Sequence, residues 1–223
     1  MHQSHNLFKG ALYEKCLKRL IDIVLALIIL TIFFPICIIS MIAIKLNSPG
    51  PIFADIPERI GQRKRKFKMY KFRSMIMNAH QMLHDDPEFK EMFEEYKKDS
   101  YKLKKDPRIT KVGKWIRKHS IDELPQMLNV IKGEMSIVGP RAYYPDELKD
   151  QQVKFPHTRE LVTKVLSVKP GITGLWQVSG RSEINFEKRI AIDAYYVDTI
   201  SLVEDLKIIF KTPVVMITGR GAV

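Results

Sequence analysis

The stretch HSIDELPQ, residues 119–126, leads through a short apolar segment into VGPR, residues 138–141. Asp122 and Glu123 place two carboxylates side by side in it. Apolar residues then recur at the three- and four-residue spacing of one buried helix face: Leu124, Met127, Leu128 and Ile131. Gly133 predicts the end of this helix, because a helix terminus favours a left-handed residue. The pattern therefore indicates a helix that starts beside two acids.

Pro125 determines where this helix begins. If Ser120 were the N-cap, Pro125 would lie inside the helix and a backbone hydrogen bond would be lost. With Asp122 as the N-cap, Pro125 falls in the first turn, where its missing N–H costs nothing. We therefore expect Asp122 at the positive end of a helix, a position that also suits a phosphate. Taken alone, an Asp-Glu pair is more often a cap followed by a solvated acid.

Charge and cysteine content limit the classes of function. The chain has 223 residues and a formal net charge of +12, which favours acidic partners such as anionic lipid, phosphorylated substrates or nucleic acid. It has two cysteines, Cys16 and Cys37, and the second lies inside a long apolar run. A disulfide framework or a cysteine-rich metal site is therefore excluded, and a reducing compartment is expected.

The apolar run from Leu20 to Ile44 is long enough to cross a bilayer. Lysine and arginine residues flank both of its ends, although positive charge marks only the cytoplasmic side of a membrane. Pro35 lies at its middle, where it can bend a helix sharply. We expect a re-entrant helix–break–helix that enters and leaves on one side; the alternative is a kinked spanning helix.

These features predict a helix-rich α/β fold in a monotopic membrane protein. Residues 1–46 form an N-terminal lead and the re-entrant membrane helix, and residues 47–223 form a cytoplasmic catalytic domain with helices on the membrane surface. The last helix, which opens at Ser201 with a capping box, carries Lys207 and Lys211 beside an apolar face and suits such a surface.

Two further segments carry candidate binding residues. If residues 67–73 are extended, Lys71 and Arg73 share one face and point the same way, as an anion site requires. Residues 169–174 read as a turn-rich loop that leads into a strand at residues 175–178, which contains Trp176; Arg181 follows it. Loops of this kind often carry binding residues.

Nine short motifs occur in a fixed order along the chain: KRLID at 18–22, SPGPIF at 48–53, YKFRSM at 70–75, DPRIT at 106–110, SIDELPQ at 120–126, GEMS at 133–136, VGPR at 138–141, KPGITG at 169–174 and DLK at 205–207. With these motifs the chain resembles the bacterial sugar transferases, or monotopic phosphoglycosyl transferases, over nearly its whole length.

The resemblance implies transfer of a sugar-1-phosphate from a UDP-sugar to undecaprenyl phosphate, with Mg²⁺ and release of UMP. Asp122 corresponds to the nucleophile that forms a phosphosugar-aspartate, and Glu123 corresponds to its partner. Both are the candidate Mg²⁺ ligands. Lys71 and Arg141 correspond to phosphate-binding residues of the family. Arg73 is added as a candidate phosphate-binding residue because it shares a strand face with Lys71.

The remaining expectations concern the donor, the partners and the location of the protein. Gln126, Trp176 and Arg181 are candidate donor-binding residues, and a glucose or galactose 1-phosphate donor is expected. Partners are the UDP-sugar, undecaprenyl phosphate and anionic membrane lipid, with self-association left open. The expected location is the cytoplasmic face of the bacterial inner membrane.

Two other classes of function compete with an enzyme. A non-catalytic membrane-surface adaptor would use the basic runs to bind anionic lipid, and Asp122 would then be only a cap. Nucleic-acid binding is suggested by charge alone; no recognition motif supports it, and the membrane segment argues against it.

Overall fold

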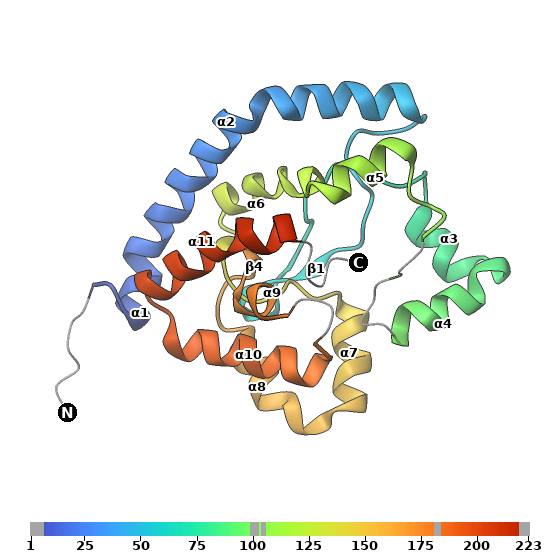
Figure 1. The fold of residues 1–223 in the computed structure, drawn as a ribbon. Coiled ribbons are helices and arrows are strands. Elements are labelled where there is room, and N and C mark those ends of the chain that lie inside the picture. Colours follow the sequence, from blue (N-terminus) through green and yellow to red (C-terminus); the bar gives the residue numbers. More distant parts are fainter. Residues whose placement is uncertain (1–6, 99–102, 104–105, 181–183, 219–223) are drawn as a thin grey trace.

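Helices dominate the computed structural model, which describes residues 7–98, 103, 106–180 and 184–218 (Figure 1). The helices and helical turns are α1 Gly10–Leu12, η1 Tyr13–Leu17, α2 Lys18–Asn47, η2 Gln62–Lys64, α3 Ala79–Asp85, η3 Pro87–Phe89, α4 Lys90–Lys98, α5 Lys111–Lys118, η4 Ile121–Glu123, α6 Gln126–Lys132, α7 Pro145–Lys154, η5 Pro156–Thr158, α8 Arg159–Val165, α9 Leu175–Ser179, α10 Phe186–Thr199 and α11 Leu202–Thr218. The strands are β1 Arg59–Ile60, β2 Lys66–Phe67, β3 Ser136–Val138 and β4 Gly171–Thr173. The antiparallel β1–β2 pair and the parallel β3–β4 pair form two small sheets. The expectation of a helix-rich fold is therefore confirmed.

The apolar run forms one helix, α2, which contains Pro35. Figure 1 shows that α2 is bent: its first part runs along one side of the molecule and its second part lies across the top. Proline removes a backbone hydrogen bond and crowds the preceding turn, which is a common cause of such a bend. Helix α2 is continuous through this bend, and its re-entry into a membrane stays a prediction. Among the described residues, α2 is the one helix long and apolar enough to cross a membrane.

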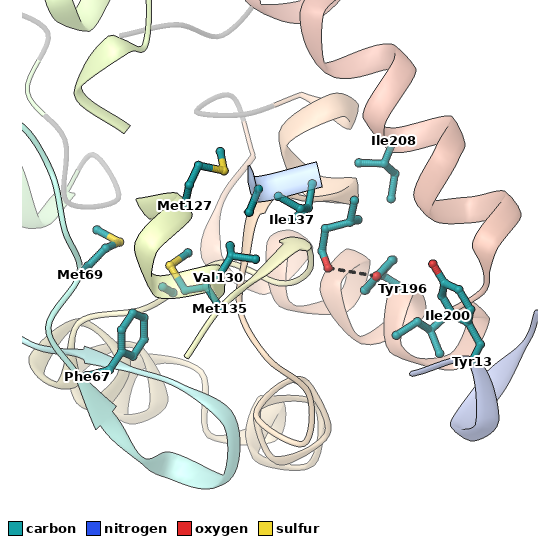
Figure 2. Packing of buried hydrophobic residues seen from close by; sticks show 13 residues of the cluster. Tyr13, Phe67, Met69, Met127, Val130, Met135, Ile137, Tyr196, Ile200 and Ile208 are labelled. Atoms are coloured by element: carbon teal, nitrogen blue, oxygen red, sulfur yellow. Dashed lines mark hydrogen bonds between the residues drawn. The ribbon is translucent and has the colours of Figure 1, made fainter. Parts of the chain in front are cut away.

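The two faces of α2 have different environments. Ala26 is fully buried in the main hydrophobic core together with Val130, Met135 and Tyr196 (Figure 2). The opposite face is apolar and exposed: Leu20, Val24, Leu27, Ile28, Ile32, Phe33, Phe34, Ile38, Ile39 and Ile42. An exposed apolar surface of this extent is typical of a protein or membrane contact. One face of α2 therefore packs on the protein interior, and the other presents an exposed apolar surface.

A buried polar network ties the start of α2 to the last helix. The carboxylate of Asp205 accepts hydrogen bonds from Tyr13 at 2.8 Å, from the Lys18 ammonium at 2.5 Å and from Tyr196 at 2.6 Å. Lys18 and Asp205 are almost completely buried. A buried charge is tolerated when it is paired and hydrogen-bonded, as it is here.

The next turn of α2 binds the central sheet. Asp22 accepts hydrogen bonds from the Ser136 hydroxyl at 2.8 Å and from the backbone N–H of Ile137 at 3.0 Å. Arg19 donates to the carbonyls of Val130 and Ile131, at 2.6 and 2.8 Å. These two carbonyls belong to the last turn of α6, where a cation also interacts well with the helix dipole. Helices α2 and α6 are thus joined by polar as well as apolar contacts.

The second part of α2 packs against a separate apolar cluster. Its buried members are Cys37, Ile44, Phe72, Ile116 and Ile121. Phe72 lies between Lys71 and Arg73, and Ile121 precedes Asp122. This cluster therefore packs the candidate site against the second part of α2.

Three local expectations have mixed outcomes. Gly133 ends α6 in a left-handed conformation, with φ of 85°, as predicted. On the predicted apolar face of α6, Met127 is buried but Leu128 is exposed, because the core lies on the side of Val130. The strand expected at residues 175–178 is wrong: the segment is helix α9, and the carbonyl of Gly174 accepts its first backbone hydrogen bonds.

We predict that Asp205→Asn destabilises the fold by about 3–5 kcal/mol. The substitution removes the closer of two ion pairs of the buried Lys18 ammonium, at 2.5 Å, and leaves only the contact with Asp22 at 3.9 Å. Chemical denaturation of the detergent-solubilised protein measures this change. Glu204→Gln on the same helix removes a solvent-accessible pair with Lys207 and should cost less than about 1 kcal/mol. Equal effects of the two substitutions would contradict the anchoring role of Asp205.

Candidate active site

The two adjacent carboxylates lie on a helical turn that precedes α6. Ser120 has a left-handed conformation, with φ of 54°, and turns the chain into η4, which carries Asp122 and Glu123. Helix α6 begins only at Gln126, with Pro125 as its N-cap residue. The expectation that Asp122 caps the helix is therefore wrong. The turn separates the acid from the helix start and leaves its carboxylate directed to another partner.

That partner is Lys71. Its ammonium lies 2.8 Å from a carboxylate oxygen of Glu123 and 3.6 Å from one of Asp122. A backbone hydrogen bond holds the two segments together, since the N–H of Phe72 donates to the carbonyl of Asp122 at 3.0 Å. The Lys71 carbonyl accepts in turn from the N–H of Ala54 at 2.9 Å. The segment is extended at this point, as expected, although β2 itself ends at Phe67.

Burial and charge act in opposite directions on these groups. Burial raises the pKa of Asp122 above its usual value; Lys71 opposes this shift, Glu123 adds to it, and Arg117 opposes it. Burial lowers the pKa of Lys71, but the two carboxylates raise it by more. Lys71 therefore stays protonated, and Asp122 is a more basic carboxylate than one in water.

Arg141 reaches the same cavity from the end of β3. Its backbone N–H donates to the Asp193 carboxylate at 3.2 Å. Its Nε lies 3.6 Å from Glu147, and its guanidinium carbon lies 5.6 Å from the centre of the Trp176 ring. The loop before it requires Gly139, because a Cβ there would lie 2.5 Å from the carbonyl oxygen of Lys169. The fold thus holds the arginine by its backbone and leaves its side chain at the cavity.

A cavity of about 820 Å³ brings most of the expected residues together. Its lining includes Lys71, Arg73, Asp122, Glu123, Arg141 and Trp176. Gln126 is buried in the first turn of α6 and does not line it. Arg181 lies outside the described residues. A cavity of this size is in the usual range for small-molecule sites.

Arg73 has a structural task as well. Its guanidinium donates to the carbonyl of Ser48 at 2.8 Å and to that of Pro49. These carbonyls lie directly after α2, so Arg73 fixes the turn by which the chain leaves the membrane helix. Its assignment as a phosphate ligand stays a prediction.

Some lining residues escaped the sequence reasoning. Arg59, His80 and Tyr144 come from β1, α3 and the start of α7, and all three line the cavity. Arg117 lines it too. The first three lie far apart in sequence and share no spacing that links them, so no pattern could have joined them.

The carboxylates also decide whether the site suits Mg²⁺. In the described part of the chain, no three histidine, cysteine or acidic side chains gather as metal ligands. Mg²⁺ is commonly held by one or two carboxylates together with substrate phosphates and water. Asp122 and Glu123 provide such a pair, so the donor set fits this ion.

Comparison with known proteins adds a family. The family described as bacterial sugar transferases matches residues 13–219 of this chain. A UDP-galactose-lipid carrier transferase of Erwinia amylovora is 41% identical to it, over 98% of this chain and 44% of that protein. An undecaprenyl-phosphate galactose phosphotransferase of Salmonella typhimurium is 42% identical, over 94% and 42%. The exopolysaccharide production protein ExoY of Sinorhizobium fredii is 40% identical, over 92% and 87%. The chain thus spans less than half of the first two relatives and most of the third.

We predict that Asp193 makes stability depend on pH. Burial raises the pKa of this carboxyl group to about 7, whereas an aspartate in the unfolded chain titrates near 4. The folded state therefore keeps its proton while the unfolded state loses it, and the free energy of unfolding falls as pH rises from about 4 to about 7. Asp193→Asn should remove this loss, which is at most about 4 kcal/mol.

Denaturation of both proteins at pH 5 and pH 8 measures the difference. Asp146→Asn, an exposed change on α7, is the control and should follow the wild type at both values. The assignment to Asp193 fails if its variant loses as much stability between pH 5 and 8 as the wild type does.

Proposed function

Because the chain belongs to the bacterial sugar transferase family, we propose that it transfers a sugar-1-phosphate from a UDP-sugar to undecaprenyl phosphate and releases UMP. The observation that carries this proposal is the placement of Asp122 beside Lys71 and Glu123 in one cavity. A carboxylate is a competent nucleophile toward phosphorus when cations offset the charge of the substrate. The reaction would begin the assembly of an exopolysaccharide or related glycan.

The reaction has two halves. In the first, an Asp122 oxygen attacks the sugar-bearing phosphorus, and the bond from that phosphorus to the bridging oxygen of the diphosphate breaks. UMP leaves with this oxygen and its electron pair, and a phosphosugar-aspartate remains. In the second, an oxygen of undecaprenyl phosphate attacks the same phosphorus, and the Asp122–phosphorus bond breaks. The carboxylate is then ready for another donor.

The surrounding residues support this chemistry. Burial makes Asp122 more basic, and Lys71 keeps a positive charge 3.6 Å from the attacking carboxylate. Glu123 holds that ammonium in place at 2.8 Å. Arg141, which follows β3, is held by the hydrogen bond from its backbone N–H to Asp193. Its side chain offsets the negative charge of the substrate phosphates. Mg²⁺ held by Asp122 and Glu123 would neutralise the diphosphate.

The donor is proposed to be UDP-galactose or UDP-glucose. Two of the relatives carry galactose in their names, as a UDP-galactose-lipid carrier transferase and an undecaprenyl-phosphate galactose phosphotransferase. Both hexoses fit the expectation drawn from the sequence. A panel of UDP-sugars, assayed for UMP release, identifies the preferred donor.

We also propose that α2 re-enters the cytoplasmic leaflet of the inner membrane. Both of its ends are bound by the same folded domain, through Lys18 at one end and through the carbonyls of Ser48 and Pro49 at the other. A helix held at both ends by one domain cannot place those ends on opposite sides of a bilayer. The exposed apolar face between them would then enter the lipid.

Anionic lipid would contact basic residues beside α2. Helix α5, which packs on α2, exposes three lysines, and Lys45 is exposed at the end of α2. The three are Lys111, Lys114 and Lys118. The denser basic run at residues 63–68 lies elsewhere, since the N–H of Arg63 donates to the carbonyl of Leu166 after α8. The lysines around α2 therefore suit lipid headgroups better than that run does.

We predict that UDP-galactose or UDP-glucose with Mg²⁺, without the lipid acceptor, leaves a sugar phosphate on the peptide that contains Asp122. Mass spectrometry detects the adduct. Asp122→Asn keeps the size of the side chain but removes the nucleophile, so turnover should fall by about 1,000-fold or more. Steady-state kinetics of the wild type should be ping-pong.

Two comparisons sharpen this test. Asp198→Asn removes an exposed ion pair with Lys164 and should keep wild-type turnover. Glu123→Gln should be strongly impaired, because Lys71 loses its nearest carboxylate. An adduct on another residue, or an active Asp122→Asn protein, would overturn the assignment of the nucleophile.

The topology predicts that both flanks of α2 are reachable from one side. Single cysteines at the exposed positions Leu7 and Arg65, in a protein with Cys16→Ser and Cys37→Ala, are labelled in spheroplasts with a membrane-impermeant thiol reagent. We expect no labelling until the cells are lysed. Labelling of one position before lysis and of the other only afterwards would show a spanning helix.

A further inference from the structure

Arg59, on β1, is a buried arginine at the wall of the cavity. Its side chain lines the cavity, yet the residue is only 7% exposed. One guanidinium nitrogen donates to the carbonyl of Ala142 at 3.0 Å, and Nε has no hydrogen-bond partner. The guanidinium carbon lies 3.2 Å from the centre of the Tyr144 ring. The guanidinium group is thus held over an aromatic ring, and its buried Nε makes no hydrogen bond.

No carboxylate pairs with this cation within the described part of the chain. Two other cations at the cavity are paired with a carboxylate, Lys71 with Glu123 and Arg108 with Asp106. Arg73 instead donates to the carbonyls of Ser48 and Pro49. Glu147 lies near the arginines instead, but it is shared: it is 3.6 Å from Arg141 and 3.7 Å from Arg189. A buried charge without its own counter-charge costs several kcal/mol. Such a cation is typical of a site completed by an anionic ligand.

The surroundings of Arg59 suit the rest of a nucleotide. Tyr144 has the guanidinium near its ring, and the His80 ring is stacked with Tyr144, with centroids 6.0 Å apart and planes at 26°. Burial, with help from His84, lowers the pKa of His80 to about 4, so this ring is neutral at physiological pH. A neutral imidazole offers one donor and one acceptor. Aromatic faces of this kind stack well on a planar base.

Arg59 and the nucleophile sit on different parts of the fold. The turn that carries Asp122 is seated on α2 through Ile121 and Phe72. The β1 strand that carries Arg59 is bonded instead to Tyr143, whose ring belongs to the core of α7, α8 and α10. Figure 1 shows α2 across the top of the molecule and these three helices at its lower side. Arg59 and the acids therefore line one cavity from different parts of the fold.

We propose that Arg59 binds the phosphate of the nucleoside monophosphate half of the donor, the group that departs as UMP, with Tyr144 and His80 beside its base. This assignment rests on the proposed function. Lys71, next to Asp122, is left to the phosphoryl group that is transferred. Charge that develops on the departing phosphate would then be offset by a guanidinium that makes no salt bridge with any described residue.

UMP is the probe that isolates this phosphate, because it contains neither the transferred phosphoryl group nor the lipid phosphate. Calorimetric titration with UMP is compared for the wild type, Arg59→Gln, Arg59→Lys and Arg65→Gln, which changes an exposed arginine away from the cavity. Arg59→Gln should weaken UMP binding by about 10- to 100-fold, the range for one charge-assisted hydrogen bond. Arg59→Lys should retain part of the affinity, and Arg65→Gln all of it.

Thermal unfolding gives a readout that a merely structural arginine would not produce. Removing an unpaired buried charge should leave the melting temperature of ligand-free Arg59→Gln equal to or above that of the wild type. The rise in melting temperature on adding UMP should be lost. A lower melting temperature without ligand, together with an undiminished rise, means that Arg59 is structural and overturns the proposal.

Two outcomes separate this inference from the proposed function. Suppose that the wild type releases UMP from a UDP-sugar in the presence of undecaprenyl phosphate, and that Arg59→Gln binds UMP as tightly as the wild type does. These results contradict the role of Arg59 and leave the transferase proposal intact. Wild-type protein that does not bind UMP defeats the role of Arg59 as well. Absence of UMP release from every UDP-sugar tested defeats the transferase proposal, whatever the binding data show.

Discussion

The hydrogen bond from the Phe72 N–H to the Asp122 carbonyl, at 3.0 Å, joins the two segments on which the site depends. Side chains alternate along the extended segment that it fixes. Lys71 reaches the carboxylates, Phe72 enters the apolar cluster under α2, and Arg73 binds the carbonyls that follow α2. Three consecutive residues thus connect the chemistry, the membrane helix and its exit turn. A displacement of this segment would move all three together.

Electrostatic balance explains why the cavity suits a diphosphate. The ammonium of Lys71 is matched by the two acids, whereas Glu147 is shared by Arg141 and Arg189, and Arg59 has no acid of its own within the described chain. The ligand-free cavity therefore holds an excess of buried positive charge. Its arginines are held by backbone carbonyls, rings and neighbouring elements, so they do not have to reorganise when an anion arrives. The cost of burying them is offset when substrate binds.

Sequence reasoning found the residues whose signals are local. Spacing and residue type are enough to recognise the adjacent acids at positions 122 and 123 and the end of a helix at Gly133. They also predict that Lys71 and Arg73, two residues apart, share one face of an extended segment. Sequence reasoning failed where tertiary packing decides. Asp122 does not cap α6, because Ser120 adopts a left-handed turn that places the acid toward Lys71. Residues 175–179 become a helix because the Gly174 carbonyl accepts their first hydrogen bonds. Arg59 carries no local signal at all, because only the fold brings it beside Tyr144 and the cavity.

The position of the membrane helix imposes a direction on the proposed reaction. The acids lie on a turn seated against α2, so an acceptor whose chain is dissolved in the lipid can bring its phosphate to Asp122 while its apolar part stays in the bilayer. A water-soluble donor has no such constraint and can occupy the side near β1 and α7. The transferred phosphoryl group then lies next to Asp122 and Lys71. One nucleophile suffices for both substrates because UMP leaves from the side of the phosphorus opposite Asp122, and the acceptor oxygen attacks from that same side once UMP has left. The covalent intermediate keeps the sugar phosphate in place while one partner leaves and the other arrives.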